Sequence, residues 1–159
     1  MKGDPKVIEL LNEALKAELT AINQYWLHYR MLDNWGVTKL AEFERHESID
    51  EMKHADRFSE RILFLEGLPN FQALGRLRIG ESVEEILKAD LEAEYEAVEM
   101  YKNGAAYCES VKDFVSRDLF VEVLADEEGH VDKIETQFEM IKSMGLQNYI
   151  QLQSEPAKE

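Results

Sequence analysis

Hydrophobic residues recur every three or four positions in four long segments of the chain, a spacing that gathers them on one face of an α-helix. The segments cover approximately residues 5–34, 39–66, 83–110 and 113–144. A shorter segment, from 146 to about 153, predicts a fifth helix. Because no segment alternates hydrophobic and polar residues as a half-buried strand would, the pattern predicts an all-α fold.

Residues that favour helix ends stand at the ends of these segments. Asp4 precedes Pro5, which suits the first position of a helix, and Ser82 with Glu85 forms a capping box before the third segment. Gly145 follows the fourth segment, where a glycine commonly ends a helix. The helix boundaries are therefore predicted by side-chain chemistry as well as by periodicity.

The lengths of the connections predict the topology. The first two helices are joined by a few residues, as are the third and fourth, so each pair forms an antiparallel hairpin. The 15 residues between 66 and 82 can span roughly 50 Å when extended. A helix of 28 residues is only about 42 Å long. The sequence predicts one domain, 1–159: a four-helix bundle with one long crossover connection, a short fifth C-terminal helix and a disordered tail from about 154.

Ionisable residues interrupt the inward stripe of every long helix near its middle. A lone buried carboxylate is costly and takes up a proton, whereas several carboxylates with histidine are best explained by a bound cation. The interrupting residues are Glu18 in the first helix, Glu44, Glu47, Glu51 and His54 in the second, Glu94 in the third, and Glu127 and His130 in the fourth.

Two Glu-x-x-His motifs, Glu51 with His54 and Glu127 with His130, place side chains on adjacent turns of one helix face, where both reach one ion. A single such motif is weak evidence, since the chain has 24 Glu and a solvated helix face gives the same pattern. The spacing between motifs is more specific. Glu18 precedes Glu51 by 33 residues, as Glu94 precedes Glu127.

A shift of 76 residues relates the two predicted hairpins. It pairs Glu18 with Glu94, Glu51 with Glu127, His54 with His130, Tyr25 with Tyr101, Ala17 with Ala93, Ala21 with Ala97 and Asp50 with Asp126. The hairpins therefore look like two copies of one pattern. We expect six residues to meet at one level of the core: Glu18, Glu51, His54, Glu94, Glu127 and His130.

Four carboxylates and two imidazoles suit two ions of intermediate hardness, iron or manganese, and four negative charges balance two divalent cations. This is the ligand set of ferritin-like di-iron and di-manganese proteins. Two such metals can each give one electron to O2. Gly129, inside the second motif, indicates either a close neighbouring helix or a tolerated cost of about 1 kcal/mol.

Composition narrows the function classes. The net charge of −15 argues against nucleic acid as a partner and favours cations. No segment reaches the length of a membrane span, and the N-terminus lacks the apolar stretch of a signal peptide. The single cysteine, Cys108, excludes an internal disulfide framework and fits a reducing cytoplasm.

Specific runs of sequence resemble the bacterioferritins, the haem-containing bacterial ferritins. These runs are "MKGD", "AINQY", "HESIDEMKHADR", "RILFLEGLPN", "DEEGH" and "MGLQNY", and they span nearly the whole chain. The resemblance implies a hollow shell of 24 subunits, built from two-fold dimers, that stores ferric mineral. It also implies a ferroxidase site in each subunit that oxidises Fe(II) with O2 or peroxide.

The resemblance further implies roles for single residues. The six residues above would bind two iron ions, with Glu51 and Glu127 as the bridging ligands, and Tyr25 would be an electron donor beside them. His46 and Asp50 would form an extra iron site on the inner surface, although a solvated pair four residues apart is the simpler alternative. A ferredoxin-type reductant is implied for iron release.

Met52 lies about 140° around its helix from the Glu47, Glu51 and His54 face, so it points away from the core. Simple surface packing would explain a methionine there. The resemblance implies instead that Met52 from each of two subunits binds one shared b-type haem. The chain has Arg45 where relatives can have a polar aromatic residue, and Phe58 and Lys133 where some carry other aromatics, so haem contacts and electron donors are less fixed than the di-iron ligands.

Three other functions compete with a ferroxidase store. A rubrerythrin-like peroxidase shares the paired motifs, but such proteins carry a Cys-x-x-Cys iron domain and this chain has one cysteine. A second competitor is a non-catalytic haem-binding or electron-transfer subunit of a mixed shell, and the intact spacing of all six ligands argues against it. A purely structural bundle does not explain acids at the centre of four stripes.

Overall fold

Five helices make up most of residues 1–158, the part of the chain that the computed structural model describes. They are α1 (Pro5–Asn34), α2 (Thr38–Phe64), α3 (Val83–Ser110), α4 (Phe114–Met144) and α5 (Leu146–Leu152). No strand occurs within the described residues, so the predicted all-α fold is confirmed. The predicted disordered tail includes Glu159, which lies outside them.

Capping side chains set the starts of α1, α3 and α4. The carboxylate of Asp4 accepts hydrogen bonds from two backbone N–H groups in the first turn of α1, and Ser82 caps α3. Some boundaries differ from the prediction by one or two residues, and α2 begins at Thr38 instead of Lys39. Asp113 is the cap of α4 rather than its first residue, because its carboxylate accepts from the N–H of Ser116 at 3.0 Å. Glu66 lies outside α2 because its φ of 66° is left-handed.

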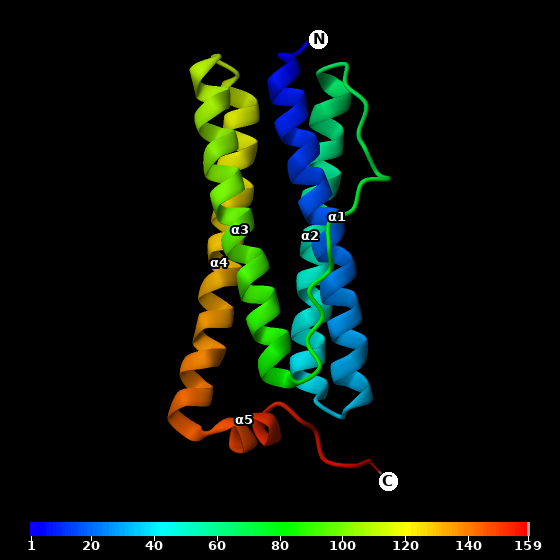
Figure 1. Ribbon diagram of the computed structural model, residues 1–159, viewed down its shortest axis with the longest axis vertical. Helices are drawn as coiled ribbons and strands as arrows, with labels where there is room; N and C mark the ends of the chain where they lie inside the picture. The colour runs from blue at the N-terminus through cyan, green and yellow to red at the C-terminus, as the bar shows by residue number, and fades with distance from the viewer. Residues whose placement is uncertain (159) are drawn as a thin grey trace.

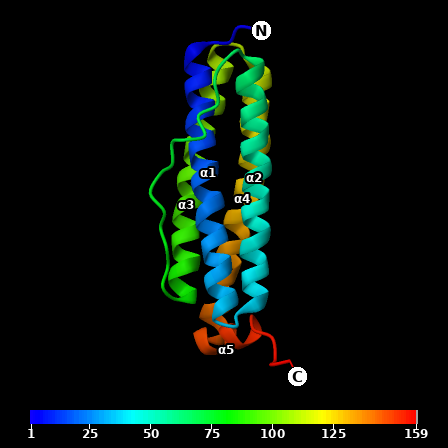
Figure 2. The same cartoon turned by 90° about the vertical axis from the view of Figure 1, so that its right-hand side faces the viewer.

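Two antiparallel hairpins, α1–α2 and α3–α4, lie side by side along one long axis (Figure 1). The crossover, residues 67–82, leaves the end of α2 and runs the length of the bundle to the start of α3 at the opposite end (Figure 2). Helix α5 lies across that opposite end. The predicted four-helix bundle with one long crossover is therefore confirmed.

A row of polar side chains on α1 holds the crossover in place. Asn12, Thr20, Gln24 and His28 stand one or two helical turns apart, so they lie along one face. They accept hydrogen bonds from the backbone N–H groups of Asn70 (2.8 Å), Gly75 (2.8 Å), Arg78 (3.0 Å) and Gly80 (3.0 Å), respectively. The extended chain thus satisfies its backbone donors on α1 instead of in a sheet.

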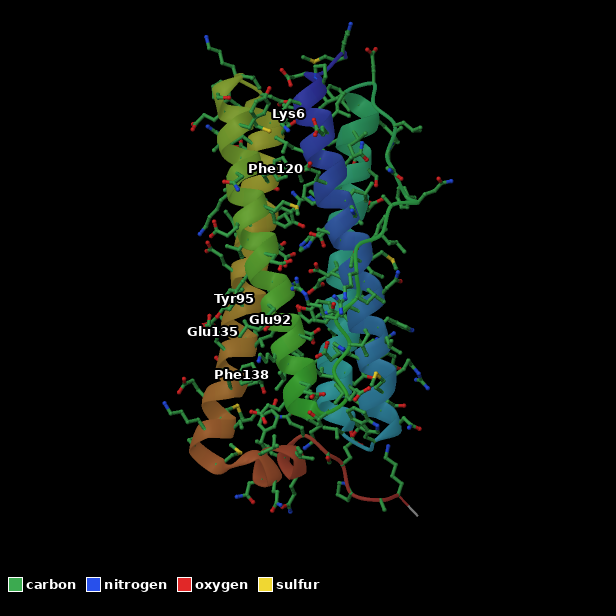
Figure 3. All side chains as sticks on the ribbon, in the orientation of Figure 1. Lys6, Glu92, Tyr95, Phe120, Glu135 and Phe138 are labelled. Carbon is green, nitrogen blue, oxygen red and sulfur yellow. The ribbon has the colours of Figure 1, made fainter. Side chains whose placement is uncertain are left out.

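The apolar core is divided into two clusters by a polar layer. One cluster, around Leu11, Phe58 and Phe120, fills the half of the bundle near the N-terminus, where Figure 3 labels Phe120. The other, around Leu32, Leu87, Ile134 and Tyr149, fills the half covered by α5. The buried carboxylates and histidines belong to neither cluster.

Two further findings concern the helices themselves. Gly129 is exposed, and a Cβ built there would have no neighbour within 4 Å. Of the two explanations for this glycine, the close helix contact is therefore wrong within the subunit, and the tolerated cost to the helix stands. Among residues 1–158, no helix has both the length and the apolar character needed to cross a membrane.

Candidate metal centre

The six residues expected to meet do meet, in the polar layer at the middle of the bundle. Their side chains form two groups of four, and within each group the candidate ligand atoms lie within 4.8 Å of one another. The first group is Glu18, Glu51, His54 and Glu127, and the second is Glu51, Glu94, Glu127 and His130. Glu51 and Glu127 belong to both groups, so each is placed to bridge two cations. All six side chains are buried.

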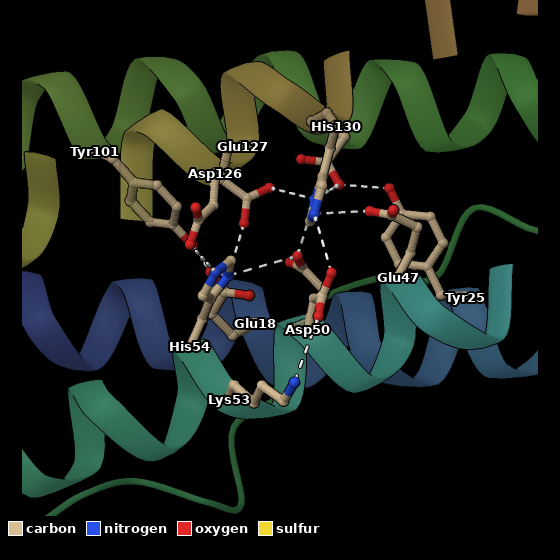
Figure 4. Close-up of polar contacts among 12 residues, drawn as sticks. Glu18, Tyr25, Glu47, Asp50, Lys53, His54, Tyr101, Asp126, Glu127 and His130 are labelled. Atoms are coloured by element: carbon tan, nitrogen blue, oxygen red, sulfur yellow. Dashed lines mark hydrogen bonds and ion pairs between the residues drawn. The ribbon is translucent and has the colours of Figure 1, made fainter. Parts of the chain in front are cut away.

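Each histidine presents one ring nitrogen to the centre and the other to an outer carboxylate (Figure 4). Nδ1 of His54 lies 3.0 Å from Glu127 and 3.5 Å from both Glu18 and Glu51. Nδ1 of His130 lies 3.2 Å from Glu51 and 3.5 Å from both Glu94 and Glu127. Nδ1 is therefore the nitrogen available to a metal on both rings.

The outer partners of the two histidines differ. Nε2 of His54 forms a hydrogen bond of 3.0 Å with Asp126, whose side chain is 56% exposed. Nε2 of His130 lies 2.8 Å from the buried Glu47 and 3.8 Å from Asp50. A carboxylate that accepts a hydrogen bond from Nε2–H keeps the ring hydrogen on Nε2, so Nδ1 has a free lone pair for a metal. The same hydrogen bond raises the basicity of the ring as a ligand.

Two tyrosines complete the pseudo-symmetric arrangement. The hydroxyl of Tyr25 donates to Glu94, and that of Tyr101 donates to Glu18 (Figure 4). Both phenols are buried, and burial raises their pKa, so they stay protonated and orient the two terminal carboxylates. The 76-residue shift seen in the sequence thus corresponds to paired side chains in space.

The buried polar atoms of the centre test whether cations fit it. No hydrogen-bond donor reaches Oε2 of Glu18, Oε1 of Glu51, Oε2 of Glu94, either oxygen of Glu127, or Nδ1 of His54 and His130. Buried oxygens of this kind are rare because each forfeits its interaction with water. All of these atoms face one another across the two groups, so the donor set fits two cations.

Protons balance part of this charge in the metal-free protein. Burial raises the pKa of Glu51 and of Glu94 well above the usual range, and neighbouring carboxylates raise it further. Burial alone would lower the pKa of His54 and His130, but contacts with Glu127 and the other glutamates outweigh it and raise the pKa of both rings. Cations entering the centre therefore replace protons.

We expect Asp126→Ala to weaken the binding of one of the two cations by about 10- to 100-fold, because His54 loses the partner that fixes its ring. Titration of the metal-free protein with Co2+, followed by its visible absorbance, measures this. Asp132→Ala, an exposed change six residues further along α4, is the matched control and leaves both affinities unchanged. Equal affinities in both variants would contradict the role of Asp126.

A third group of candidate ligands extends outward from the centre. It consists of Glu47, Asp50 and His130, and the amino group of Lys53 lies 3.9 Å from Asp50. His46 is exposed and belongs to none of the ligand groups found within residues 1–158. Within one subunit, Asp50 therefore groups with Glu47 and His130 beside the centre and not with His46.

A cavity of about 710 Å3 connects the centre with the surface between α1 and α3. Its lining includes Glu51 and Glu94 at the centre and Gly75, Arg76 and Arg78 of the crossover. The alanines that the 76-residue shift pairs, Ala17 with Ala93 and Ala21 with Ala97, line its walls. Small side chains at these positions leave space between α1 and α3.

Met52 lies away from the centre, as predicted, on the outer face of α2. Its side chain is 57% exposed beside a cavity of about 340 Å3. Apolar side chains of Ile22, Trp26, Leu27 and Ile49 line the same cavity. An exposed thioether in an apolar groove is suited to a flat apolar ligand or to a second protein surface.

Sequence reasoning missed a second buried polar group beside the centre. His28, Glu44 and Asp90 are all buried and offer ligand atoms within 4.8 Å of one another. Glu44 lies on a predicted stripe, but His28 and Asp90 do not. A search for polar residues one turn from the predicted ligands would have found both, because His28 follows Tyr25 and Asp90 precedes Glu94.

Comparison with known proteins gives consistent matches. Residues 8–144 match a family model described as a Ferritin-like domain. The chain is 55% identical over 159 residues to a bacterioferritin of Brucella melitensis, covering 100% of this chain and 99% of that protein. It is 49% identical over 150 residues to a bacterioferritin of Streptomyces coelicolor, covering 94% and 90%.

A solved structure has the same fold throughout. It is the 2.6 Å structure of Rhodobacter capsulatus bacterioferritin, which has a metal-free dinuclear site and a haem iron in a crystallographic special position. The TM-score is 0.99 at 50% sequence identity, and the match covers 100% of this chain and 99% of that chain.

Proposed function

Because this chain belongs to the bacterioferritins, a family of iron-storage proteins, we propose that it oxidises Fe(II) with O2 or peroxide and stores the ferric product. The observation that carries this proposal is the pair of overlapping four-residue groups that share Glu51 and Glu127. Two adjacent metal positions are what a two-electron reaction at one O2 requires.

Each residue of the centre has a proposed role. Glu18 and His54 bind one Fe(II), Glu94 and His130 bind the other, and Glu51 with Glu127 binds both. Each Fe(II) gives one electron, so two of them with two protons reduce O2 to hydrogen peroxide and leave two Fe(III). The four carboxylates and two Nδ1 atoms hold the ions, and Asp126 and Glu47 keep the rings oriented.

Tyr25 is the proposed electron donor. Its hydroxyl already donates to Glu94, so the phenol has a carboxylate ready to take its proton when it loses an electron. Tyr101 has the corresponding hydrogen bond with Glu18, and the same geometry would let it act in the same way.

Storage requires a shell, and we propose one of 24 subunits built from two-fold dimers. His46 and Asp50 are proposed to take up iron on its inner surface, and Asp50, 3.8 Å from His130, would pass ions between this surface and the centre. The buried single cysteine, Cys108, supports a reducing compartment, so we place the shell in the cytoplasm. A ferredoxin-type reductant is proposed for iron release.

The same dimer is proposed to hold the haem. A crystallographic special position lies on a symmetry element, so the haem iron of the R. capsulatus relative sits where symmetry copies meet. The exposed Met52 in its apolar groove supports a b-type haem shared by two subunits here. Its porphyrin would lie against Trp26, Leu27 and Ile49 of each copy.

The test uses the purified assembly. On adding Fe(II) in air, we expect a rapid phase of ferric absorbance equivalent to about two iron ions per subunit, followed by slow mineral growth. Size-exclusion chromatography with light scattering is expected to give a mass near 24 subunits of 18.5 kDa. A rapid phase without a shell would contradict the storage proposal, and a shell without a rapid phase would contradict the ferroxidase proposal.

A further inference from the structure

Below the metal centre, toward α5, the bundle has a second buried polar layer, formed by His28, Glu44 and Asp90. All three side chains are 0 or 1% exposed. They lie about one helical turn from Tyr25, Glu47 and Glu94 on α1, α2 and α3, respectively. No hydrogen bond or ion pair among the described residues joins Glu44 or Asp90 to a proposed iron ligand.

Asp90 connects this layer to the crossover. Its Oδ1 accepts hydrogen bonds from Nε2 of Gln24 and from Nδ1 of His28, both at 2.9 Å. Gln24 and His28 in turn accept the backbone N–H groups of Arg78 and Gly80. Since Nε2 of His28 accepts, the ring hydrogen is on Nδ1 and the imidazole is neutral.

Three oxygens of the layer have no donor: both of Glu44 and Oδ2 of Asp90. No Lys or Arg among residues 1–158 forms an ion pair with either carboxyl group, and His28 brings no charge. Two buried carboxyl groups that face each other cannot both be ionised at reasonable cost. Asp90 has two N–H donors that stabilise its charge, so a single proton belongs on Glu44.

The internal repeat shows that packing does not require this layer. The 76-residue shift relates Asp90 to Ala14, His28 to Gly104 and Glu44 to Phe120. These three counterparts lie on the other side of the metal centre and are buried in the apolar cluster near the N-terminus. A bundle of this geometry can therefore be filled by apolar residues at these positions, and the polar set serves another purpose.

We propose that Glu44 and Asp90 form a proton-binding site that anchors the crossover. With its proton, Glu44 donates to Oδ2 of Asp90, and Asp90 holds Gln24 and His28 in the orientation that receives Arg78 and Gly80. Without it, two buried negative charges repel each other, the Asp90 carboxylate turns away, and both anchors of the crossover loosen. The site needs neither metal nor O2, so it stands apart from the proposed function.

The surroundings keep the proton in place at neutral pH. Burial raises the pKa of Glu44 well above its usual range, and the charge of Asp90 raises it further. The other titratable groups around the pair are His28 and Tyr25 on α1, Glu47 on α2, Glu94 on α3 and Tyr149 on α5. Because the bound form is the protonated one, the anchor is complete at low pH and is lost as the pH rises through the raised pKa.

Loosening the anchor has a structural consequence at the cavity. Arg78 lines the cavity that reaches Glu51 and Glu94, and it is one of the two residues held through Asp90. Loss of the proton would therefore widen the cavity at its crossover wall.

The direct test is infrared spectroscopy of the metal-free assembly. A protonated carboxylic acid gives a C=O stretching band above the amide I region, and we expect Glu44→Gln to remove one such band that the wild-type protein shows at neutral pH. Glu42→Gln, an exposed change on the same helix, is the matched control and keeps the band. A wild-type spectrum with no band of this kind, or its full retention in Glu44→Gln, would overturn the proposal.

Hydrogen exchange tests the anchoring. After correction for intrinsic exchange, we expect the protection of peptides covering residues 76–82 to fall by at least about tenfold as the pH rises through the range in which the wild-type band disappears. Glu44→Gln keeps a neutral amide that donates to Asp90, so its protection should not change with pH. The same fall in both proteins would overturn the role of Glu44. Because protonated Glu51 and Glu94 also absorb in this region, the band of Glu44 is the one that differs between the wild-type and Glu44→Gln spectra. If the variant does not fold, constant protection of residues 76–82 in the wild-type protein across the pH range would overturn the proposal.

Discussion

Replacing Glu51 by Gln is expected to abolish the rapid phase of Fe(II) oxidation and to lower the cation stoichiometry of the centre. Glu51 belongs to both four-residue groups, so its loss affects both metal positions at once. An amide can offer one weak oxygen but no charge, which leaves two divalent cations with three carboxylates. The expected decrease in rate exceeds about 100-fold, since losing only an outer partner of a ligand already costs up to that much.

Stopped-flow absorbance after mixing with Fe(II) in air measures the rate, and a Co2+ titration of the metal-free protein measures the stoichiometry. Glu60→Gln, an exposed change on α2, is the matched control. An unchanged rapid phase in Glu51→Gln would show that Glu51 is not a bridging ligand. Because both four-residue groups include Glu51, the expected result for Glu51→Gln is slow mineral growth with no rapid phase.

The same substitution should stabilise the metal-free protein. Burial and the neighbouring Glu18 raise the pKa of Glu51 in the folded state, so the folded chain keeps a proton that the unfolded chain gives up above about pH 4.5. The contribution of Glu51 to the free energy of unfolding of the wild-type protein therefore falls as the pH rises, by about 1 kcal/mol per pH unit up to the pKa in the folded state. The variant has no titrating group at this position and shows no such loss. Thermal unfolding in a chelator at pH 5 and pH 8 is expected to show the larger gain at pH 8.

The six central residues could be predicted because the sequence repeats them. Spacings of 33 and 76 residues relate positions on four helices, and helical periodicity places all of them on inward faces. Their height in the bundle follows from the short turn in each hairpin, which fixes how two helices align. The repeat itself specifies which residues meet, so their positions follow without knowledge of the contacts between the helices.

The layer of His28, Glu44 and Asp90 could not be found in this way. Its residues have no repeat, since their counterparts are Gly104, Phe120 and Ala14, and they come together only when α1, α2 and α3 pack. The hydrogen bonds that hold the crossover could not be predicted either, because they join side chains of α1 to the backbone of a segment without regular structure. Such contacts depend on the path of the chain, which the hydrophobic pattern does not describe.

A second large effect is expected at Met52. Met52→Leu keeps the volume and apolar character of the side chain but removes the thioether sulfur, which is the only group at this position able to bind haem iron. We expect the purified assembly to lose essentially all of its haem absorbance while its mass and Fe(II) oxidation remain. Met140→Leu, whose side chain packs against the cluster at the α5 end, is the control that keeps the haem.

The stoichiometry of that haem distinguishes sharing from simple binding. The groove beside Met52, at about 340 Å3, is at the low end of ligand pockets, so one copy covers only part of a porphyrin. In the proposed dimer, a two-fold axis would bring a second identical groove and a second Met52 to the other face of the haem, because an isologous contact pairs each residue with itself or its symmetric partner. One haem per two subunits with two equivalent sulfur ligands is therefore expected from iron and haem analysis and from the visible spectrum. One haem per subunit, or an unchanged spectrum in Met52→Leu, would contradict both the sharing and the ligand.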